Sequence, residues 1–364
     1  MTIRAIRMPK WGLSMEEGTI VEWLKSEGDE IAPGDELMDI ETTKITNVLE
    51  ATAGGRLARI VAGEGAVMPV GALIGVLVEG AVPEAEIDAF VAAAPAVEAV
   101  AEADGGGPAL EVIEAGGLRF TVATAGEGSP LVLLHGFAGD HDNWMLTMED
   151  LRGGARVIAP DLPGHGASDK SVGDGSLAAL SDAVAALLDE MGLRGAVVAG
   201  HSLGGALAMR LALDRPDLVA RLVLVCPAGL PGGTLNDTFL RGVTGAEKAR
   251  DVKAALRLLV RDPALVTRDM VDGVVRFLRL DGARAALETI RARLLEGAEL
   301  AALQDRLADL PDTVLILGGA DAITGAPDLG ALPGGWAVHR IDEAGHLPQL
   351  ETPAAVAAIL RDTL

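Results

Sequence analysis

The sequence is short of cysteine, of aromatic residues and of positive charge, and each shortage narrows the class of protein. A single cysteine, Cys226, in 364 residues excludes an intrachain disulfide framework and a multi-cysteine zinc site, and we expect no metal cofactor. Tyrosine is absent and aromatic residues make up 2%, so the cores must be built from Ala, Val, Leu and Ile, which suits parallel sheets covered by helices. The formal net charge of −23 argues against nucleic acid as a partner, because binding phosphates requires a basic surface.

Long apolar segments are also missing. No uninterrupted apolar run approaches the roughly 18–20 residues that cross a bilayer. The first residues, MTIRAIRMPKWG, lack the apolar core of a secretory signal. Together with the single cysteine, these absences predict a soluble cytoplasmic protein without membrane contact.

The pattern of the sequence changes twice along the chain. Residues 1–80 contain short strand-like runs separated by Gly, Pro and Asp, which predicts an all-β unit; two similar turn segments indicate a quasi-repeat. Residues 81–108 are dominated by Ala, Pro, Glu and Gly, and we expect a flexible linker. Residues 109–364 alternate apolar strand-like runs with amphipathic helices, as in a parallel sheet, and the consecutive helices of about 229–306 predict an inserted cap.

Lys44 lies between two strand-like runs in the segment DIETTKITN, so it should occupy an exposed hairpin tip. The whole of residues 1–80 resembles the lipoyl domains of 2-oxo acid dehydrogenase complexes, which have an all-β barrel-sandwich fold of the lipoyl/biotinyl type. Biotin carriers share that fold but place methionines beside the lysine, whereas Thr43 and Ile45 stand here. The resemblance implies that Lys44 carries covalent lipoate; the alternative is an ordinary surface lysine.

Residues Gly200–Gly204 match the G-x-S-x-G nucleophile elbow. A strand-like run, GAVVA, enters the motif and a helical run, LGGALAMRLAL, leaves it, which is the context that the elbow requires. Small residues are needed because the turn is sharp and the backbone is crowded. We therefore expect Ser202 to be the nucleophile of an α/β-hydrolase fold.

The partners of Ser202 follow from the chain order Ser, acid, His of that fold. Asp321 follows the apolar run TVLILGG, and His346 lies in a loop before the last helix. His346 would deprotonate Ser202, and Asp321 would fix its tautomer. The remaining candidates are poorer: the acids Asp312 and Asp328, the rival histidine His141, and the histidines placed in turns, in the elbow or on a strand, namely His135, His165, His201 and His339.

The oxyanion hole should be formed by the backbone N–H groups of Phe137 and Leu203. Phe137 closes the first core strand within His-Gly-Phe, and Leu203 follows the nucleophile. The segment DLPGHGAS at 161–168 is a further signature of the α/β-hydrolase superfamily, and we interpret it as loop architecture. The resemblance to that superfamily covers residues 110–364, with the cap as its variable part.

The fusion of the two domains indicates a function that neither domain indicates alone. It resembles the E2 component of acetoin dehydrogenase complexes, a dihydrolipoyllysine-residue acetyltransferase. The resemblance implies transfer of an acetyl group from the lipoyl arm of Lys44 to coenzyme A, through an acetyl-serine on Ser202 or by direct attack of the CoA thiol. It also implies a thiamine-diphosphate-dependent E1, a dihydrolipoamide dehydrogenase E3 and a homo-oligomeric core as partners.

Two features of ordinary E2 components are missing from the sequence. The H-x-x-x-D-G motif of the usual acyltransferase domain is absent, and the linker is too short and too acidic for an obvious subunit-binding domain. The alternative functions are a serine hydrolase, either a thioesterase or a carboxylesterase, that carries a lipoyl domain, and a non-catalytic scaffold.

Positive charge gathers on one expected cap helix. Residues 1–80 contain 7 Lys/Arg and 13 Asp/Glu, whereas residues 229–306 contain 13 and 11. Within that cap, basic residues recur at three- and four-residue spacing opposite an apolar face of Val252, Leu256, Leu259 and Val260; the basic residues are Arg250, Lys253, Arg257 and Arg261. This face is either a solvated surface or a docking site for CoA phosphates or for the acidic lipoyl domain.

Overall fold

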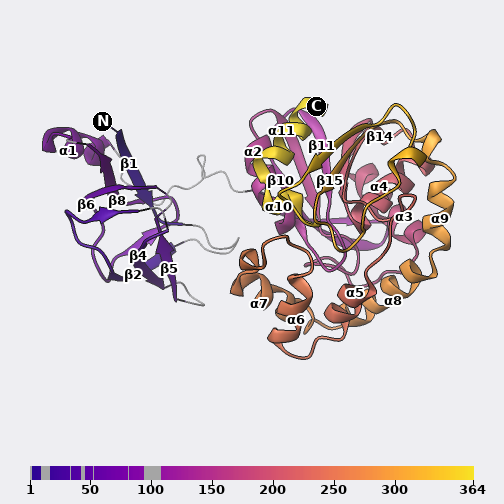
Figure 1. Cartoon of the computed structure of the whole chain (residues 1–364), viewed down its shortest axis with the longest axis horizontal. Helices are drawn as coiled ribbons and strands as arrows, with labels where there is room; N and C mark the ends of the chain where they lie inside the picture. Colours follow the sequence, from indigo (N-terminus) through magenta and orange to yellow (C-terminus); the bar gives the residue numbers. More distant parts are fainter. Residues whose placement is uncertain are drawn as a thin grey trace. The chain divides into compact units, whose positions relative to one another are not determined.

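The computed structural model describes residues 2–9, 17–32, 34–41, 46–51, 53–80, 82–93 and 108–364. The chain forms two compact units, Met1–Gly107 and Pro108–Leu364, which are described separately (Figure 1). No helix in the described part of the chain is long and apolar enough to cross a membrane.

The first unit consists of two four-stranded antiparallel sheets that enclose an apolar core. One sheet has the order β1 (Thr2–Arg7), β8 (Leu73–Glu79), β6 (Gly55–Ile60) and β3 (Glu30–Ile31). The other has the order β5 (Thr46–Glu50), β4 (Glu36–Glu41), β2 (Glu17–Trp23) and β7 (Val67–Pro69). Each sheet takes strands from both halves of the unit, so neither half can bury its apolar face alone.

The quasi-repeat expected from the sequence is present in the hydrogen bonds. Gly28 N–H donates to the Leu57 carbonyl at 2.7 Å, and Gly65, 37 positions later, donates to the Ile20 carbonyl at 2.7 Å. Gly34 and Gly71, again 37 positions apart, donate to Ala51 and Met8. All four glycines have positive φ, which L side chains rarely adopt, so these turns explain the Gly punctuation of the sequence.

Strands β4 and β5 form an antiparallel pair whose ends, Glu41 and Thr46, face one another. Lys44 stands between these two strands in the sequence, but it lies outside the described residues. Part of the segment expected to be a linker is helical: α1 (Glu84–Ala93) buries Ile87 beside Val76 and Val78 of β8. The apolar residue Ile87 therefore attaches the first part of that segment to the β-unit.

The second unit is built on an eight-stranded sheet. Its order is β16 (Ala337–Ile341), β15 (Asp312–Gly318), β14 (Val219–Val225), β13 (Ala196–His201), β11 (Ser129–Leu134), β12 (Ala155–Pro160), β10 (Leu118–Ala125) and β9 (Ala109–Ala115). The strands from β16 to β12 pair in parallel, and β10 and β9 continue the sheet in antiparallel pairing.

Both faces of this sheet are covered, which explains the continuous apolar runs of its strands. Leu131 and Leu133 of β11 face a core that includes side chains of α2 (Met145–Leu151) and α11 (Pro353–Thr363). Val132 and Leu134 face the opposite core, with α3 (Leu177–Glu190), α4 (Leu203–Asp214) and the cap. The short helix α10 (Pro348–Glu351) precedes α11.

The cap is inserted between β14 and β15. It contains α5 (Asp237–Thr244), α6 (Ala249–Leu256), α7 (Arg268–Phe277), α8 (Ala283–Glu296) and α9 (Ala298–Gln304). Val252, Leu256, Leu259 and Val260 are buried as predicted. The prediction that one helix carries all four basic residues is wrong, however: α6 ends at Leu256, and Arg257 and Arg261 lie beyond it.

Candidate active site

Backbone strain marks one edge of the parallel sheet. Among the described residues, the non-glycine residues with positive φ are Ala138, Ser202 and Cys226, at 59°, 55° and 42°. These residues follow the three neighbouring central strands β11, β13 and β14 at their carboxyl ends. Residues held in this conformation cost about 1–3 kcal/mol each and cluster at functional sites, so this edge is the candidate active site.

Ser202 occupies the strained turn between β13 and α4, with φ 55° and ψ −115°. The turn requires the two glycines of the motif, because a Cβ at Gly200 would lie 2.2 Å from the Gly204 carbonyl oxygen. A Cβ at Gly204 would lie 2.3 Å from the Leu134 carbonyl oxygen. Ser202 is only 7% exposed, so a group that reacts with it is shielded from bulk water.

Two backbone N–H groups near Ser202 have no acceptor among the described residues. One is the N–H of Leu203, the first residue of α4, and the other is that of Phe137. Gly136, which precedes Phe137, packs so closely on the elbow that a Cβ there would lie 3.1 Å from Ser202 Cβ. The two residues expected to form the oxyanion hole therefore offer free donors beside the serine.

His346 and Asp321 are brought together as the sequence predicts. His346 Nδ1 lies 2.9 Å from Asp321 Oδ2, and the side chains are 1% and 4% exposed. Asp321 follows the carboxyl end of β15, and His346 precedes α10. The fold therefore brings together two residues that are 25 positions apart in the sequence. Because Nδ1 faces the carboxylate, Nε2 is the nitrogen left to accept a proton.

Asp321 is held in its ionised form by a set of donors. Burial by itself raises the pKa of this carboxyl, but His346 and the Thr324 hydroxyl outweigh burial and hold the pKa well below its usual range. Oδ1 accepts the N–H groups of Ile323 and Thr324 at 2.8 and 3.1 Å, and Oδ2 accepts the Thr324 hydroxyl at 2.7 Å. An ionised Asp321 keeps the proton of neutral His346 on Nδ1.

The loop that carries His346 is fixed from three sides. His201 of the elbow donates Nε2–H to the His346 carbonyl at 2.7 Å, and burial lowers the pKa of His201 well below its usual value, so it stays neutral. The His346 N–H donates to the carbonyl of Leu259 in the cap at 2.7 Å. The Glu351 carboxylate accepts Gly345 N–H at 2.8 Å through one oxygen and Arg261 N–H at 2.7 Å through the other.

The competing acids and histidines of the sequence have other partners. Asp312 pairs with Arg221 at 2.7 Å, and Asp328 caps a turn through Gly330 N–H. His141 Nδ1 lies 2.7 Å from Asp161 Oδ1, so this histidine is paired with an acid other than Asp321. His339 is exposed on the edge strand β16, and His135 and His165 bond backbone groups in turns.

Thr324, His201 and Glu351 were not predicted as members of this site. A signal for Thr324 exists in the segment Asp-Ala-Ile-Thr, because an aspartate commonly accepts N–H groups two and three residues later. The contact of His201 with the His346 carbonyl spans 145 positions and has no local signal. The buried Cys226 is an inert neutral group, because burial and Asp321 raise the pKa of its thiol well above the ordinary value.

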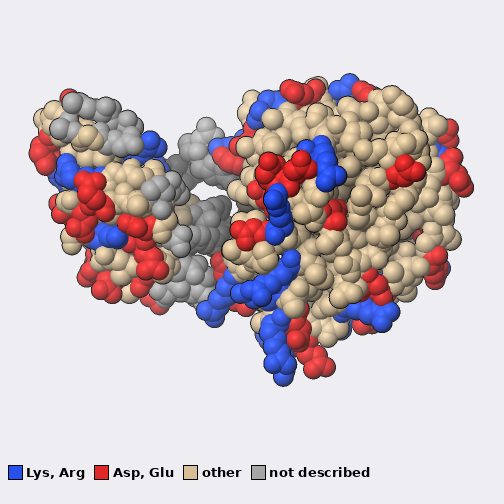
Figure 2. Space-filling model, in the orientation of Figure 1, with Lys and Arg blue, Asp and Glu red and all other residues tan. Residues whose placement is uncertain are grey.

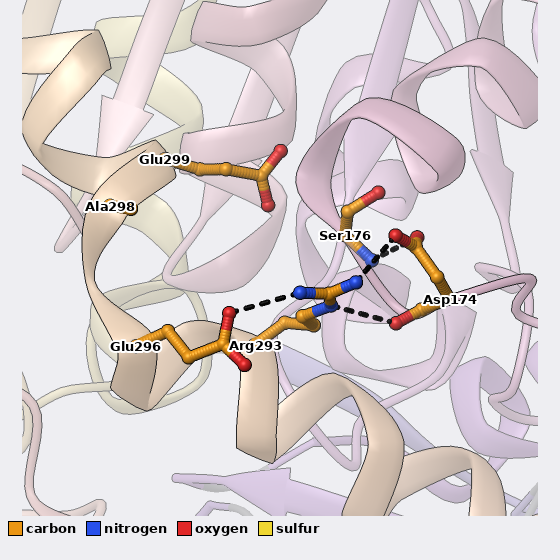
Figure 3. A pocket seen from close by; sticks show the side chains of 6 residues that line it. All are labelled: Asp174, Ser176, Arg293, Glu296, Ala298 and Glu299. Carbon is orange, nitrogen blue, oxygen red and sulfur yellow. Dashed lines mark hydrogen bonds and ion pairs between the residues drawn. The ribbon is translucent and has the colours of Figure 1, made fainter.

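A polar hollow of about 350 Å³ lies on the second unit, lined by Asp174, Ser176, Arg293, Glu296, Ala298 and Glu299 (Figure 3). Arg293 there pairs with Asp174 at 2.8 Å and with Glu296 at 3.0 Å. Glu299 accepts the first N–H groups of α3 from Leu177 and Ala178. Arg293, Asp174 and Glu296 pair with one another, Glu299 caps α3, and the hollow contains none of Ser202, Asp321 and His346, so we interpret it as structural.

Two family models match the chain. Residues 4–77 match the model described as biotin-requiring enzyme, and residues 131–359 match the alpha/beta hydrolase family. The first match covers the β-unit, and the second begins at β11 and ends within α11.

Two curated relatives match over nearly the whole chain. A protein of Cupriavidus necator is 40% identical, covering 100% of this chain and 98% of its own, and one of Pseudomonas putida is 42% identical, covering 97% and 96%. Each is named dihydrolipoyllysine-residue acetyltransferase component of acetoin cleaving system. Among solved structures, a meta-cleavage product hydrolase of Pseudomonas fluorescens IP01 is 26% identical with a TM-score of 0.63, covering 69% of this chain and 96% of its own.

Proposed function

The chain belongs to the family of dihydrolipoyllysine-residue acetyltransferase components of acetoin-cleaving systems, and from this we propose that Ser202, His346 and Asp321 carry its chemistry. The reaction is the transfer of an acetyl group from a lipoyl-lysine arm to coenzyme A. The observation that carries the proposal is the His346–Asp321 pair, 2.9 Å apart at the sheet edge where Ser202 sits in a strained turn.

We propose Lys44 as the residue that holds lipoate. The paired strands β4 and β5 bring Glu41 opposite Thr46, which fits a lysine presented from a hairpin. Thr43 and Ile45 stand where biotin carriers have methionines. When attached, lipoate supplies an acyl thioester on a long arm, and tethering in one chain raises its effective concentration at the second unit.

Ser202 acts first in the proposed mechanism. Its Oγ–H proton passes to His346 Nε2 as Oγ forms a bond to the acetyl carbonyl carbon. Asp321 stabilises the imidazolium, and the N–H groups of Phe137 and Leu203 stabilise the oxyanion. The carbon–sulfur bond then breaks, and the departing sulfur takes the proton from His346, which leaves acetyl-Ser202.

Coenzyme A completes the transfer by the reverse sequence. The CoA thiol gives its proton to His346 as sulfur bonds to the acetyl carbon, the Oγ–carbon bond breaks, and Ser202 Oγ recovers the proton. Ser202 and His346 are only 7% and 1% exposed, so the reacting groups are shielded from bulk water during the transfer.

Ser202→Ala tests the acetyl-serine route. We expect wild-type protein supplied with acetyl-dihydrolipoamide without CoA to gain one acetyl group on Ser202 by peptide mass spectrometry, and the variant to gain none and to make no acetyl-CoA. A fully active Ser202→Ala variant would refute the role of Ser202 and leave direct attack by the CoA thiol.

Product analysis separates transfer from the alternative, a hydrolase carrying a lipoyl domain. Transfer predicts acetyl-CoA as the main product from acetyl-dihydrolipoamide and CoA, whereas a thioesterase would release free acetate at the same rate without CoA. Intact mass of the natively expressed chain, with Lys44→Arg as the control, tests the lipoyl attachment.

The partners follow from membership of an acetoin-cleaving system. We propose a thiamine-diphosphate-dependent E1 that loads the arm, a dihydrolipoamide dehydrogenase E3 that reoxidises it, and a homo-oligomeric assembly. Co-purification of the tagged chain with these two activities, and its mass by light scattering, test the proposal. The cytoplasmic location stays a prediction from composition.

A further inference from the structure

Part of the cap is basic although the chain as a whole is strongly acidic. Residues 248–279 contain 8 Lys/Arg and 4 Asp/Glu, against a net charge of −23 for the whole sequence. Figure 2 shows Lys and Arg gathered over α6 and α7, the two cap helices that pack on one another. A local excess of positive charge on an acidic protein raises the local concentration of anionic ligands.

Lys253, Arg257, Arg276 and Arg279 have no ion-pair partner among the described residues. We call these four cations the cap patch. Other cap cations are committed: Arg241 and Arg291 both bond Asp237, at 2.6 Å each, and Arg284 bonds the Thr244 and Ala246 carbonyls. The structure therefore distinguishes cations that hold the cap together from cations that are free to bind an anion.

Three of the cap-patch cations, Arg257, Arg276 and Arg279, are exposed, and Lys253 is half-buried. Helix α6 buries Val252 and Leu256, whereas Arg257 is exposed. Helix α7 buries Val271, whereas Arg276 is exposed. The apolar faces are used for packing, so the cap patch is available to a ligand.

The chain segment that follows Arg257 of the cap patch contacts the loop of the catalytic base. Leu259, two positions after Arg257, accepts the His346 N–H at 2.7 Å. Gly345 packs against the same cap segment, since a Cβ there would lie 2.7 Å from the Arg261 nitrogen. An anion bound at the end of α6 thus lies close along the chain to the contact that positions His346.

We propose that the cap patch binds the phosphate groups of coenzyme A. Coenzyme A carries its phosphates at the nucleotide end and its thiol at the other end, and the thiol must reach His346. A basic surface that lies close along the chain to the Leu259–His346 contact can hold the nucleotide end while the pantetheine arm extends toward Ser202. This inference rests on the proposed function, because it takes coenzyme A as the acceptor.

The test removes three positive charges in the full-length chain with Lys253→Gln, Arg257→Gln and Arg276→Gln. We expect KM for CoA to rise about tenfold or more, because removing one cation from a phosphate site weakens binding by a few-fold to tenfold. KM for uncharged acetyl-dihydrolipoamide and kcat at saturating CoA should stay within about twofold, because neither depends on phosphate binding. The matched control removes three other exposed charges, each paired with an aspartate, through Arg119→Gln, Arg194→Gln and Arg306→Gln.

Dephospho-CoA, which lacks the 3′-phosphate, sharpens the test. Wild-type protein should bind it more weakly than CoA by calorimetry, and the triple variant should discriminate less between the two. An unchanged KM and Kd for CoA in the triple variant would overturn the proposal. A second result would also overturn the proposal: the triple variant binds CoA normally, but its turnover falls only when the acetyl group is carried by the lipoyl domain. The cap patch would then be a docking site for that acidic domain.

The calorimetric measurement also separates this proposal from the proposed function. If the wild-type protein released acetate and formed no acetyl-CoA, the transferase function would fail. In that case, wild-type protein that binds CoA and a triple variant that does not would still support the cap patch as a CoA site. Wild-type protein that binds no CoA would refute the cap patch as a CoA site.

Discussion

The conversion Asp321→Asn should trap His346 in the wrong tautomer. All groups around the Asp321 carboxylate are donors: Oδ1 faces the backbone N–H groups of Ile323 and Thr324, and Oδ2 faces the Thr324 hydroxyl and His346 Nδ1. An asparagine amide offers one acceptor oxygen and one NH₂ donor. The backbone N–H groups cannot become acceptors, so the amide oxygen must face them and the NH₂ must face His346.

With the NH₂ group of the substituted side chain facing it, His346 Nδ1 can only accept a hydrogen bond. The imidazole proton must then lie on Nε2. A protonated Nε2 cannot take the Ser202 proton. The opposite orientation places NH₂ against two backbone donors, and each unpaired buried donor costs about 1–3 kcal/mol. The same tautomer trap in serine protease triads lowers kcat about 10⁴-fold. We therefore expect a loss of kcat of roughly 10³–10⁴-fold, or about 4–5.5 kcal/mol.

The assay is acetyl-CoA formation from acetyl-dihydrolipoamide at saturating substrates, with folding checked by circular dichroism. Asp328→Asn is the matched control, since Asp328 is exposed and caps only a turn through Gly330 N–H, and its kcat should stay within about twofold. A folded Asp321→Asn variant that kept more than about a tenth of the wild-type kcat would refute the reasoning that Asp321 sets the His346 tautomer.

Two further predictions concern stability. Gly204→Ala should lower the free energy of unfolding in urea by about 1–3 kcal/mol, because its Cβ would meet the backbone oxygens of Leu134 and His135 at 2.3 and 2.5 Å. The control Gly153→Ala should leave that free energy unchanged, because nothing lies within 4 Å of the new Cβ. Equal effects of the two substitutions would contradict the packing argument. Burial lowers the pKa of His135 from 6.5 to about 4 and that of His165 to about 3, so the unfolded chain binds more protons between pH 6.5 and 4. The stability that these neutral histidines contribute is present above pH 6.5 and is lost as the pH falls toward 4, by about 3 kcal/mol for His135 alone. The measurement is the urea midpoint as a function of pH. A constant midpoint over this range, or a His135→Gln variant with an unchanged pH profile, would show that the buried histidines do not control acid stability.

Local pattern was enough to predict the elements that bear the chemistry. The nucleophile elbow could be recognised because Gly200 and Gly204 serve a backbone approach that no other residue allows, so the requirement is written in adjacent positions. The alternation of strands and helices predicted the parallel sheet, and the chain order of that fold then indicated Asp321 and His346. The quasi-repeat of two similar turn segments was visible because these turns require glycines with positive φ, and the structure then gave their equivalence at an offset of 37 residues.

The sequence by itself determined the residue types, the two-domain order and the candidate triad, because each depends on a short motif or on periodicity. Only the tertiary structure decided which side chains support the triad. Those contacts join positions far apart in the chain: His201 bonds the His346 carbonyl across 145 positions, and Leu259 and Glu351 tie the cap to the same loop. The cap also needed the structure. Helix α6 ends at Leu256, so both Arg257 and Arg261 lie beyond it. Arg261 is bonded to Glu351 through its N–H, whereas Lys253 and Arg257 have no ion-pair partner in the described part of the chain. Helical periodicity could place all these cations on one face, but only packing could show which of them remain available to an anion.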